Sequence, residues 1–189
     1  MKIKSSYLVA VLFSFTRLES ARAAQLSPFD EAEAFKAGGY LLTESKWHSD
    51  CNEPTKANYD PAAITSVRDL NGDSLPEVVI QEACTSCYGH TGVGFTIVSK
   101  QSNNTWKKIV SATGMPTFLK TNGVSGWPDI EFGITGFCLP VWRWDGERYE
   151  LNRRHEYQPE ACERRLSGTG APMVDSIRMW KKDTMNSKK

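Results

Sequence analysis

The residues with the clearest chemical capacity form one short acidic segment, Asp69–Glu77, with the sequence DLNGDSLPE. Side-chain oxygens recur at its first, third, fifth and ninth positions, and a backbone carbonyl lies between the last two. This spacing lets a short loop curl around a hard cation such as calcium, which prefers six to eight oxygen ligands. Calcium is therefore the candidate cofactor, and the candidate ligands are Asp69, Asn71, Asp73, the carbonyl of Leu75, and Glu77.

The segment differs from an EF-hand loop. Its twelfth position is Ile80 rather than a bidentate glutamate, and the flanking residues alternate as in strands rather than helices. Ser74 occupies the sixth position, where a left-handed backbone is often needed and a residue other than glycine costs about 1 kcal/mol. A second interpretation stays open, in which Asn71-Gly72 is a turn and the carboxylates cap backbone amides.

The same residues carry a resemblance to a known family. The segment from Asp69 to Asp73, followed by Pro76-Glu77-Val78-Val79, resembles the calcium loop of the FG-GAP/VCBS repeats, which form the blades of integrin-type β-propellers. The resemblance implies a loop between two adjacent strands, a bound cation, and a protein that binds partners outside cells. It departs from the family at Ser74, where glycine is usual, and at Glu77, where aspartate is commoner. The motif occurs once, and one copy does not close a propeller.

The wider chain also resembles small exported bacterial proteins in which such a loop is followed by three further motifs. Here these motifs are Cys87-Tyr88-Gly89, Trp127-Pro128-Asp129-Ile130 and Trp144-Asp145-Gly146. This resemblance implies a shared fold and brings no activity with it.

Residues 1–23 have the pattern of a cleaved signal peptide. Lys2 and Lys4 precede the apolar run Tyr7–Phe15, and Ala21-Arg22-Ala23 supplies the small residues that signal peptidase accepts. The apolar run is too short to span a bilayer as a stable anchor; a short tethering or core helix is the alternative. We therefore expect a periplasmic or secreted protein with no stable membrane anchor after cleavage.

The rest of the chain is mildly acidic. The signal segment holds four of the 23 basic and one of the 22 acidic residues, so 19 and 21 remain. Several of the basic residues lie in 178–189, which we expect to be a flexible tail. The body between, residues 24–177, suits a single domain, and its charge does not favour nucleic acid as a partner.

Five cysteines in an exported chain predict disulfides, with one sulfur left over by the odd number. Bridges that close long loops restrict the unfolded chain most. This favours Cys51 with Cys162, and Cys138 with Cys87 or Cys84. A thioredoxin-like pair at Cys84 and Cys87 would need a following helix, whereas glycines follow. A c-type haem site needs histidine directly after the second cysteine, where Tyr88 stands. Zinc would need further ligands, for which Cys138, His48 or His155 are the candidates, so a structural bridge is the favoured interpretation.

These groups need a scaffold, and the sequence predicts a mainly β one. Helix formers over Asp30–Ala37, ended by Gly38-Gly39, predict one short N-terminal helix. Further along, short apolar or alternating runs separated by turn residues predict an antiparallel, sheet-rich single domain of the α+β kind. The predicted strands are Ile64–Val67, Glu77–Gln81, Gly94–Ser99, Trp106–Val110, Thr117–Lys120, Ile130–Ile134, Leu139–Trp144 and Tyr149–Leu151.

Asp145-Gly146 lies between two of these runs and predicts a two-residue hairpin loop. Such a loop would place Trp142 opposite Tyr149 and Arg143 opposite Arg148. Because like charges directly opposite one another are unfavourable, the alternatives are a turn one residue longer or a carboxylate close to the two arginines.

Three functions fit these observations. The leading hypothesis is a calcium-stabilised binding or structural module of the bacterial periplasm, with a protein or glycan partner in the cell envelope. The second is a periplasmic inhibitor or immunity protein against a cell-wall hydrolase, and the third is a hydrolase of an envelope polymer. We assign no catalytic residue, because no nucleophile signature is present. An exposed aromatic surface for a glycan or a protein could be formed by Trp127, Trp142, Trp144 and Tyr149. For Trp142 and Trp144 we prefer the alternative, in which they belong to the core.

Overall fold

The structure, a computed structural model, describes residues 26–51, 59–133 and 136–166. The predicted signal peptide, the basic tail and the outer ends of the predicted domain lie outside the described residues. Within them, no helix combines the length and the apolar character needed to cross a membrane.

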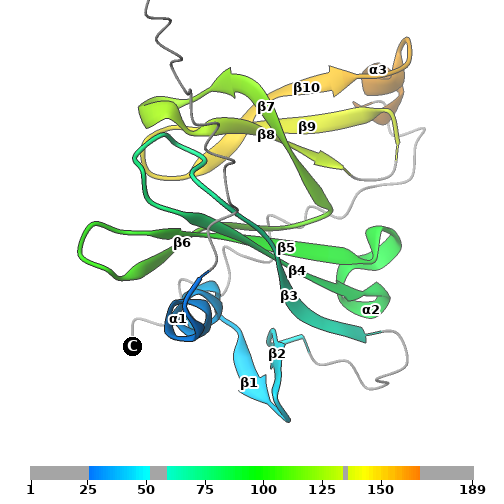
Figure 1. The fold of residues 1–189 in the computed structure, drawn as a ribbon. Helices are drawn as coiled ribbons and strands as arrows, with labels where there is room; N and C mark the ends of the chain where they lie inside the picture. The colour runs from blue at the N-terminus through cyan, green and yellow to red at the C-terminus, as the bar shows by residue number, and fades with distance from the viewer. Residues whose placement is uncertain (1–25, 52–58, 134–135, 167–189) are drawn as a thin grey trace, which may run out of the picture.

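In the described part of the chain, ten strands form two antiparallel sheets stacked face to face, as Figure 1 shows. In each sheet every strand pairs with its neighbour in the sequence. The first sheet has six strands: β1 (Leu41–Thr43), β2 (Lys46–His48), β3 (Tyr59–Arg68), β4 (Glu77–Cys84), β5 (Val93–Lys100) and β6 (Trp106–Thr113). The second has four: β7 (Met115–Asn122), β8 (Pro128–Gly133), β9 (Cys138–Trp144) and β10 (Tyr149–Glu156).

A single residue connects the two sheets. Gly114 lies between β6 and β7 and has a φ of 108°, a left-handed value that glycine adopts without a side-chain clash. The chain therefore turns from one layer into the other at a sharp corner.

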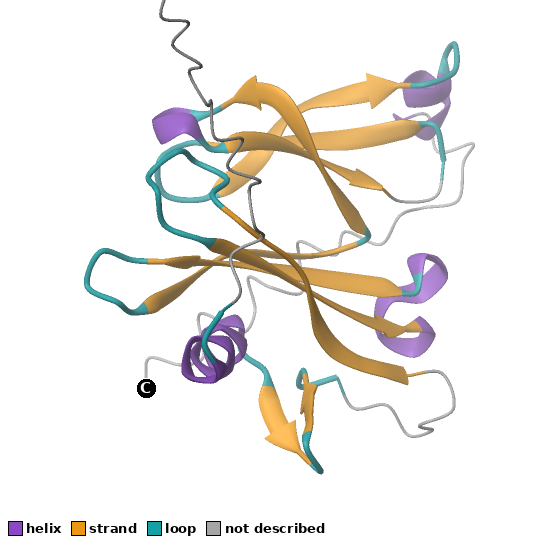
Figure 2. Ribbon diagram, viewed as in Figure 1, coloured by secondary structure: helices purple, strands orange, loops and turns teal. Residues whose placement is uncertain are grey.

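The helices of the described residues are few and short, as the colouring in Figure 2 makes clear. The longest, α1 (Pro28–Gly38), begins at Ser27, whose hydroxyl accepts the Asp30 amide at 3.1 Å, and ends before Gly39 with a φ of 96°. These are standard N-cap and C-cap arrangements. The others are α2 (Thr85–Tyr88), η2 (Gly89–Thr91), η3 (Val124–Gly126) and α3 (Ala161–Leu166).

One hydrophobic core fills the space between the sheets. It takes alternate side chains from the facing strands, as expected for stacked sheets. The tryptophans Trp127 and Trp144 and the ring of Tyr149 belong to it, and Trp142 packs against it. The preferred interpretation of Trp142 and Trp144, as core residues rather than an exposed surface, is therefore confirmed. The buried members are Val79, Phe95, Ile97, Val110, Trp127, Ile130, Phe132, Trp144 and Tyr149.

A second core lies on the opposite face of the six-stranded sheet, under α1. Phe35 of α1 stacks on Trp47 of β2, with ring centroids 4.8 Å apart and an angle of 9° between the planes. This contact ties both the helix and the β1–β2 hairpin to the sheet. The buried members are Ala34, Phe35, Tyr40, Ala62, Val78, Ile80 and Val98.

The predicted fold class is confirmed, since the chain is mainly β and antiparallel with few short helices. Each of the eight predicted runs corresponds to one of the strands β3 to β10, and the predicted helix corresponds to α1.

The predicted two-residue hairpin between β9 and β10 is wrong. Tyr149 pairs with Trp144 and Glu150 with Arg143, so the loop contains four residues, 145–148. The reason is local: the Asp145 carboxylate accepts the amides of Glu147 at 2.7 Å and Arg148 at 2.8 Å, which closes a longer turn. The longer loop places a glutamate, not an arginine, opposite Arg143.

Candidate functional site

The acidic segment forms the loop between β3 and β4. Arg68 and Glu77 pair across its base, and Gly72 and Ser74 have left-handed φ values of 82° and 68°. Ser74 therefore adopts the conformation that the sixth position of such a loop requires.

The loop's side-chain oxygens cap its own backbone. Asp69 accepts the amides of Gly72 at 2.7 Å and Ser74 at 2.9 Å. Asn71 accepts the Asp73 amide at 3.0 Å, and Asp73 accepts the Leu75 amide at 2.8 Å. This is the arrangement of the capped turn that the sequence left open as an alternative to a metal loop. An ionised carboxylate has about four acceptor positions, so these bonds leave Asp69 and Asp73 acceptors that face solvent, where both side chains are exposed.

Glu77 differs from the other candidate ligands because its side chain is fully buried. One carboxylate oxygen accepts the Leu70 amide at 2.7 Å and the other accepts the Ser99 hydroxyl at 2.8 Å. Among the described residues, the acidic side chains of the loop do not form a group of three with all ligand oxygens within 4.8 Å of one another. The donor types suit calcium, but Glu77 is directed into the protein rather than towards Asp69 and Asp73.

Burial raises the pKa of Glu77 to about 7, although the hydrogen bonds from Leu70 and Ser99 oppose this effect. The negative charges of Asp73 and Asp69 raise it further. The protonation of this carboxyl group and the charge of the loop are therefore linked.

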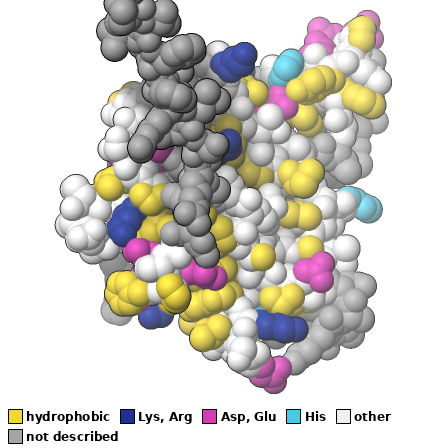
Figure 3. All heavy atoms as spheres, viewed as in Figure 1, with side chains coloured by type: hydrophobic (Ala, Val, Ile, Leu, Met, Phe, Trp, Pro, Cys, Tyr) yellow, Lys and Arg dark blue, Asp and Glu magenta, His cyan; other side chains and the backbone are white. Residues whose placement is uncertain are grey.

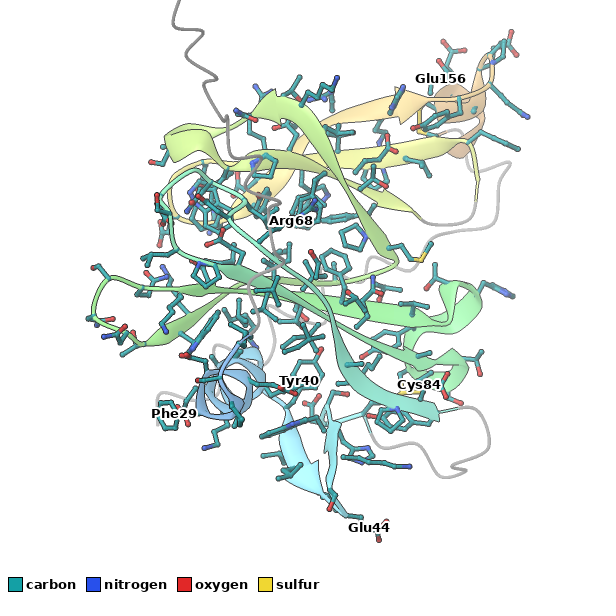
Figure 4. The ribbon with its side chains drawn as sticks, viewed as in Figure 1. Phe29, Tyr40, Glu44, Arg68, Cys84 and Glu156 are labelled. Atoms are coloured by element: carbon teal, nitrogen blue, oxygen red, sulfur yellow. A yellow bond between two sulfur atoms is a disulfide. The ribbon has the colours of Figure 1, made fainter. Side chains whose placement is uncertain are left out.

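The loop also contacts the second sheet. A Cβ atom on Gly126, in η3, would overlap the carbonyl oxygen of Asn71. The Arg68 guanidinium lies 4.4 Å from the ring centroid of Phe118 in β7, and Figure 4 shows Arg68 between the two sheets. The loop therefore lies at the junction of the two layers.

The four-stranded sheet carries a charged cluster that the sequence did not predict. Asp129 is fully buried and receives hydrogen bonds from Arg143 at 2.9 Å, Arg153 at 2.7 Å and Thr121 at 2.6 Å. Burial alone would raise the pKa of Asp129, but these hydrogen bonds outweigh it and hold the pKa well below its usual range. Asp129 thus stays ionised as the anchor of two partly exposed arginines.

Glu131 lies two residues further along β8 and is also buried. It accepts the Tyr157 hydroxyl at 2.8 Å and lies 2.7 Å from Nδ1 of His155. The alternation of Asp129 and Glu131 with the core residues Ile130 and Phe132 was the available sequence signal. Their partners lie on other strands or, in the case of Tyr157, just after β10, and could not be identified from that pattern.

The cysteines do not pair as predicted. Cys138 pairs with Cys162, with their Cα atoms 4.9 Å apart, and Cys51 lies with Cys84 and Cys87. The predicted bridges from Cys51 to Cys162 and from Cys138 to Cys87 or Cys84 are corrected accordingly.

The layers of the fold explain the correction. Cys162 donates its amide to Glu156 at 3.1 Å, and Figure 4 shows Glu156 at the end of the upper sheet while Cys84 ends a strand of the lower one. Each bridge thus forms within one layer, and loop length did not determine the pairing.

A buried carboxylate adjoins the cluster of Cys51, Cys84 and Cys87. Glu82 is almost fully buried and accepts the hydroxyl groups of Tyr59, at 2.8 Å, and Tyr88, and the Ser49 amide at 3.3 Å. Burial, followed by the adjacent Glu82 carboxylate, raises the pKa of both tyrosines above its ordinary value. Both tyrosines therefore remain hydrogen-bond donors that hold Glu82 in place.

A cleft of about 510 Å³ opens between α1, the β1–β2 hairpin and β3. Within the described residues, β2 pairs with β3 only through Trp47 and Ala62, although β3 continues to Arg68. The remaining edge of β3 thus borders the cleft with no described strand beside it. The lining residues are mostly apolar: Leu26, Phe35, Trp47, Pro61, Ala62, Ala63, Ile64 and Val67, with Glu31, Ser45 and Lys46.

Exposed apolar side chains accompany the cleft on the same elements. Phe29 of α1 and Leu41 and Leu42 of β1 are 73%, 68% and 58% exposed. Figure 3 shows hydrophobic side chains gathered around α1 on this face. A group of exposed apolar side chains of this kind often marks a surface that binds another molecule.

Comparisons of this chain with protein-family models, with curated proteins and with solved structures find no match.

The contact between the acidic loop and the second sheet predicts different costs for two glycine substitutions. Gly72→Ala should cost only the left-handed strain of about 1 kcal/mol, since no atom lies within 4 Å of the added Cβ. Gly126→Ala should cost a further ~1–3 kcal/mol because its Cβ meets the Asn71 carbonyl. Urea unfolding of both variants measures the difference, and equal losses would show that the loop does not pack against η3.

The raised pKa of Glu77 predicts a pH-dependent gain from Glu77→Gln. A carboxyl group whose pKa rises from 4.5 to about 7 on folding stabilises the fold fully below pH 4.5, and this contribution is lost as pH rises through about 7. At pH 8 the variant should therefore be more stable than the parent by up to about 3 kcal/mol, with little difference at pH 4.5. Chemical unfolding across this pH range tests it. A pH-independent difference between the two proteins would contradict the prediction.

Proposed function

We propose that this chain is an exported, disulfide-bonded binding module of the bacterial periplasm that holds an extended peptide segment of an envelope protein along the edge of β3. The observation that carries the proposal is the open part of the β3 edge beside an apolar cleft. A strand edge offers backbone donors and acceptors in a row, which only another extended polypeptide backbone satisfies in full. The cleft would then receive alternate apolar side chains of that segment.

A protein partner fits better than a glycan. Stacking on a sugar requires exposed aromatic rings, whereas Trp127, Trp144 and Tyr149 are 6%, 6% and 5% exposed and belong to the core. The exposed apolar residues near the cleft are Phe29, Leu41 and Leu42, of which only one is aromatic. Apolar side chains of a peptide are the matching chemistry for this surface.

A hydrolase gains no support from the charged cluster on β8. A glycosidase needs one carboxyl group that is protonated at working pH to act as the acid. The depressed pKa of Asp129 is the opposite of that requirement. Its two arginine partners also occupy its oxygens, so its role is to hold the strands of the sheet together.

The binding proposal predicts site-specific photo-crosslinking. A photoreactive phenylalanine analogue at Ala63, which is exposed and lines the cleft, should form adducts with one envelope protein in the exporting bacterium. The same analogue at Asn122, an exposed residue of β7 in the other sheet, should not. Peptide mapping of the adduct should place the link within one extended segment of the partner.

An added charge supplies a matched control for this experiment. Ala63→Glu should release the partner, because it places a carboxylate in the apolar cleft, whereas Asn122→Glu adds the same charge elsewhere and should leave binding unchanged. Equal crosslinking from both positions, or adducts with glycan alone, would refute the peptide-edge proposal. A partner that is a cell-wall hydrolase and loses activity in the complex would identify the module as an inhibitor.

We further propose that calcium stabilises the fold through Asp69, Asn71 and Asp73, as the resemblance to FG-GAP/VCBS loops implies. The exposed acceptors of Asp69 and Asp73 and the left-handed Ser74 support this. Sites of extracellular modules have dissociation constants of about 10⁻⁴ to 10⁻³ M. At a calcium concentration ten times the dissociation constant, the gain in unfolding free energy is about 1.4 kcal/mol.

The calcium proposal predicts that thermal unfolding shifts upward in millimolar calcium and that Asp69→Asn or Asp73→Asn removes the shift. Asp145→Asn is the control, because Asp145 also caps backbone amides but lies in the β9–β10 turn. It should lower stability while keeping the calcium response. A parent protein that melts at the same temperature with calcium and with chelator would exclude the site.

A further inference from the structure

Three cysteine sulfurs meet at one end of the six-stranded sheet. Cys51 follows β2, Cys84 ends β4 and Cys87 lies in α2, and all three Sγ atoms are within 4.8 Å of one another. The Cα atom of Cys87 lies 6.1 Å from that of Cys51 and 5.3 Å from that of Cys84. Both separations are within the range that a disulfide spans.

One sulfur cannot hold two disulfides at once. Cys138 and Cys162 form their own bridge in the other layer, so the remaining three cysteines can form one further bridge within the chain. The geometry offers Cys87 two partners for it, in a Cys51–Cys87 form and a Cys84–Cys87 form. A disulfide and a third sulfur are thus held side by side, which is the arrangement that thiol–disulfide exchange requires.

We propose that Cys51, Cys84 and Cys87 form an internal thiol–disulfide exchange site in which Cys87 alternates between the other two. In one direction the Cys84 thiolate attacks the Cys87 sulfur of the Cys51–Cys87 bridge. The Cys84–Cys87 bond forms as the Cys87–Cys51 bond breaks, and Cys51 leaves as a thiolate that takes up the proton Cys84 gave to solvent. No net oxidation or reduction occurs, so no further reactant is needed.

The positions of the outer sulfurs suit this step. The Sγ atoms of Cys51 and Cys84 are 3.9 Å apart, so each outer sulfur lies beside the bridge that the other forms with Cys87. The Cys84 sulfur also accepts the Cys87 amide at 3.1 Å, and this bond holds it beside its target.

Exchange changes what the bridge ties together. The Cys51–Cys87 bridge joins residues 36 apart and links the chain just after the β1–β2 hairpin to α2. The Cys84–Cys87 bridge joins residues three apart and leaves that link open. Because Ser45, Lys46 and Trp47 of the hairpin line the cleft, the two forms differ in how firmly one wall of the cleft is held.

Slow labelling with a maleimide, followed by digestion and mass spectrometry of the non-reduced full chain after export, tests the exchange. Cys51 is partly exposed and Cys84 is almost fully buried, so the label should collect on Cys51. The peptide bridged by Cys51–Cys87 should be lost at the same rate as the Cys84–Cys87 bridge appears, while Cys138–Cys162 stays intact. The control is Cys84→Ser, which should keep the Cys51–Cys87 bridge and take up no label at Cys51.

Three results would overturn the proposal, and the first and the third need only the parent protein. The first is a single bridge isomer whose amount does not change while label accumulates. The second is equal labelling of Cys51 in the parent and in Cys84→Ser. The third is a purified protein in which all three thiols are reduced and hold a metal ion that chelator removes. If the exchange is observed but no peptide segment is bound, the proposed function is wrong and the exchange proposal stands.

Discussion

The burial of Glu77 is the constraint on which the arrangement of the two sheets depends. Glu77 is the first residue of β4. Its carboxylate accepts hydrogen bonds from the Leu70 amide within the acidic loop and from the Ser99 hydroxyl of β5. The loop is thereby held against the edge of the core, where Asn71 packs on η3 of the second sheet. A buried carboxylate without such partners would be strongly unfavourable, so the loop conformation and the burial of Glu77 require each other.

The strands were predictable because their patterns are local. Alternating or continuous apolar runs between turn residues identify β3 to β10, and helix formers followed by two glycines identify α1. The hairpin after Trp144 was mispredicted because the Asp145 carboxylate captures two amides and lengthens the turn. The β1–β2 hairpin depends on the stacking of Trp47 on Phe35, a contact between segments that no local pattern contains.

The same distinction between local patterns and contacts from distant segments applies to the candidate sites. The acidic loop could be located from its spacing, and Ser74 takes the left-handed conformation that its position requires. The inward direction of Glu77 depends on Ser99, a residue from another strand, and was not predictable. Likewise, the grouping of Cys51 with Cys84 and Cys87 depends on sheet order, which loop-length arguments ignore. The edge of β3 became visible only when the short pairing with β2 was known.

The most direct test of this account is the titration of the Glu77 carboxyl carbon by NMR, with and without calcium. We expect a midpoint near pH 7 without calcium, because the group is buried and faces two like charges. Calcium at Asp69 and Asp73 would neutralise those charges and lower the midpoint. A midpoint near the ordinary value of 4.5 that calcium does not change would contradict both the burial of Glu77 and its link to the loop.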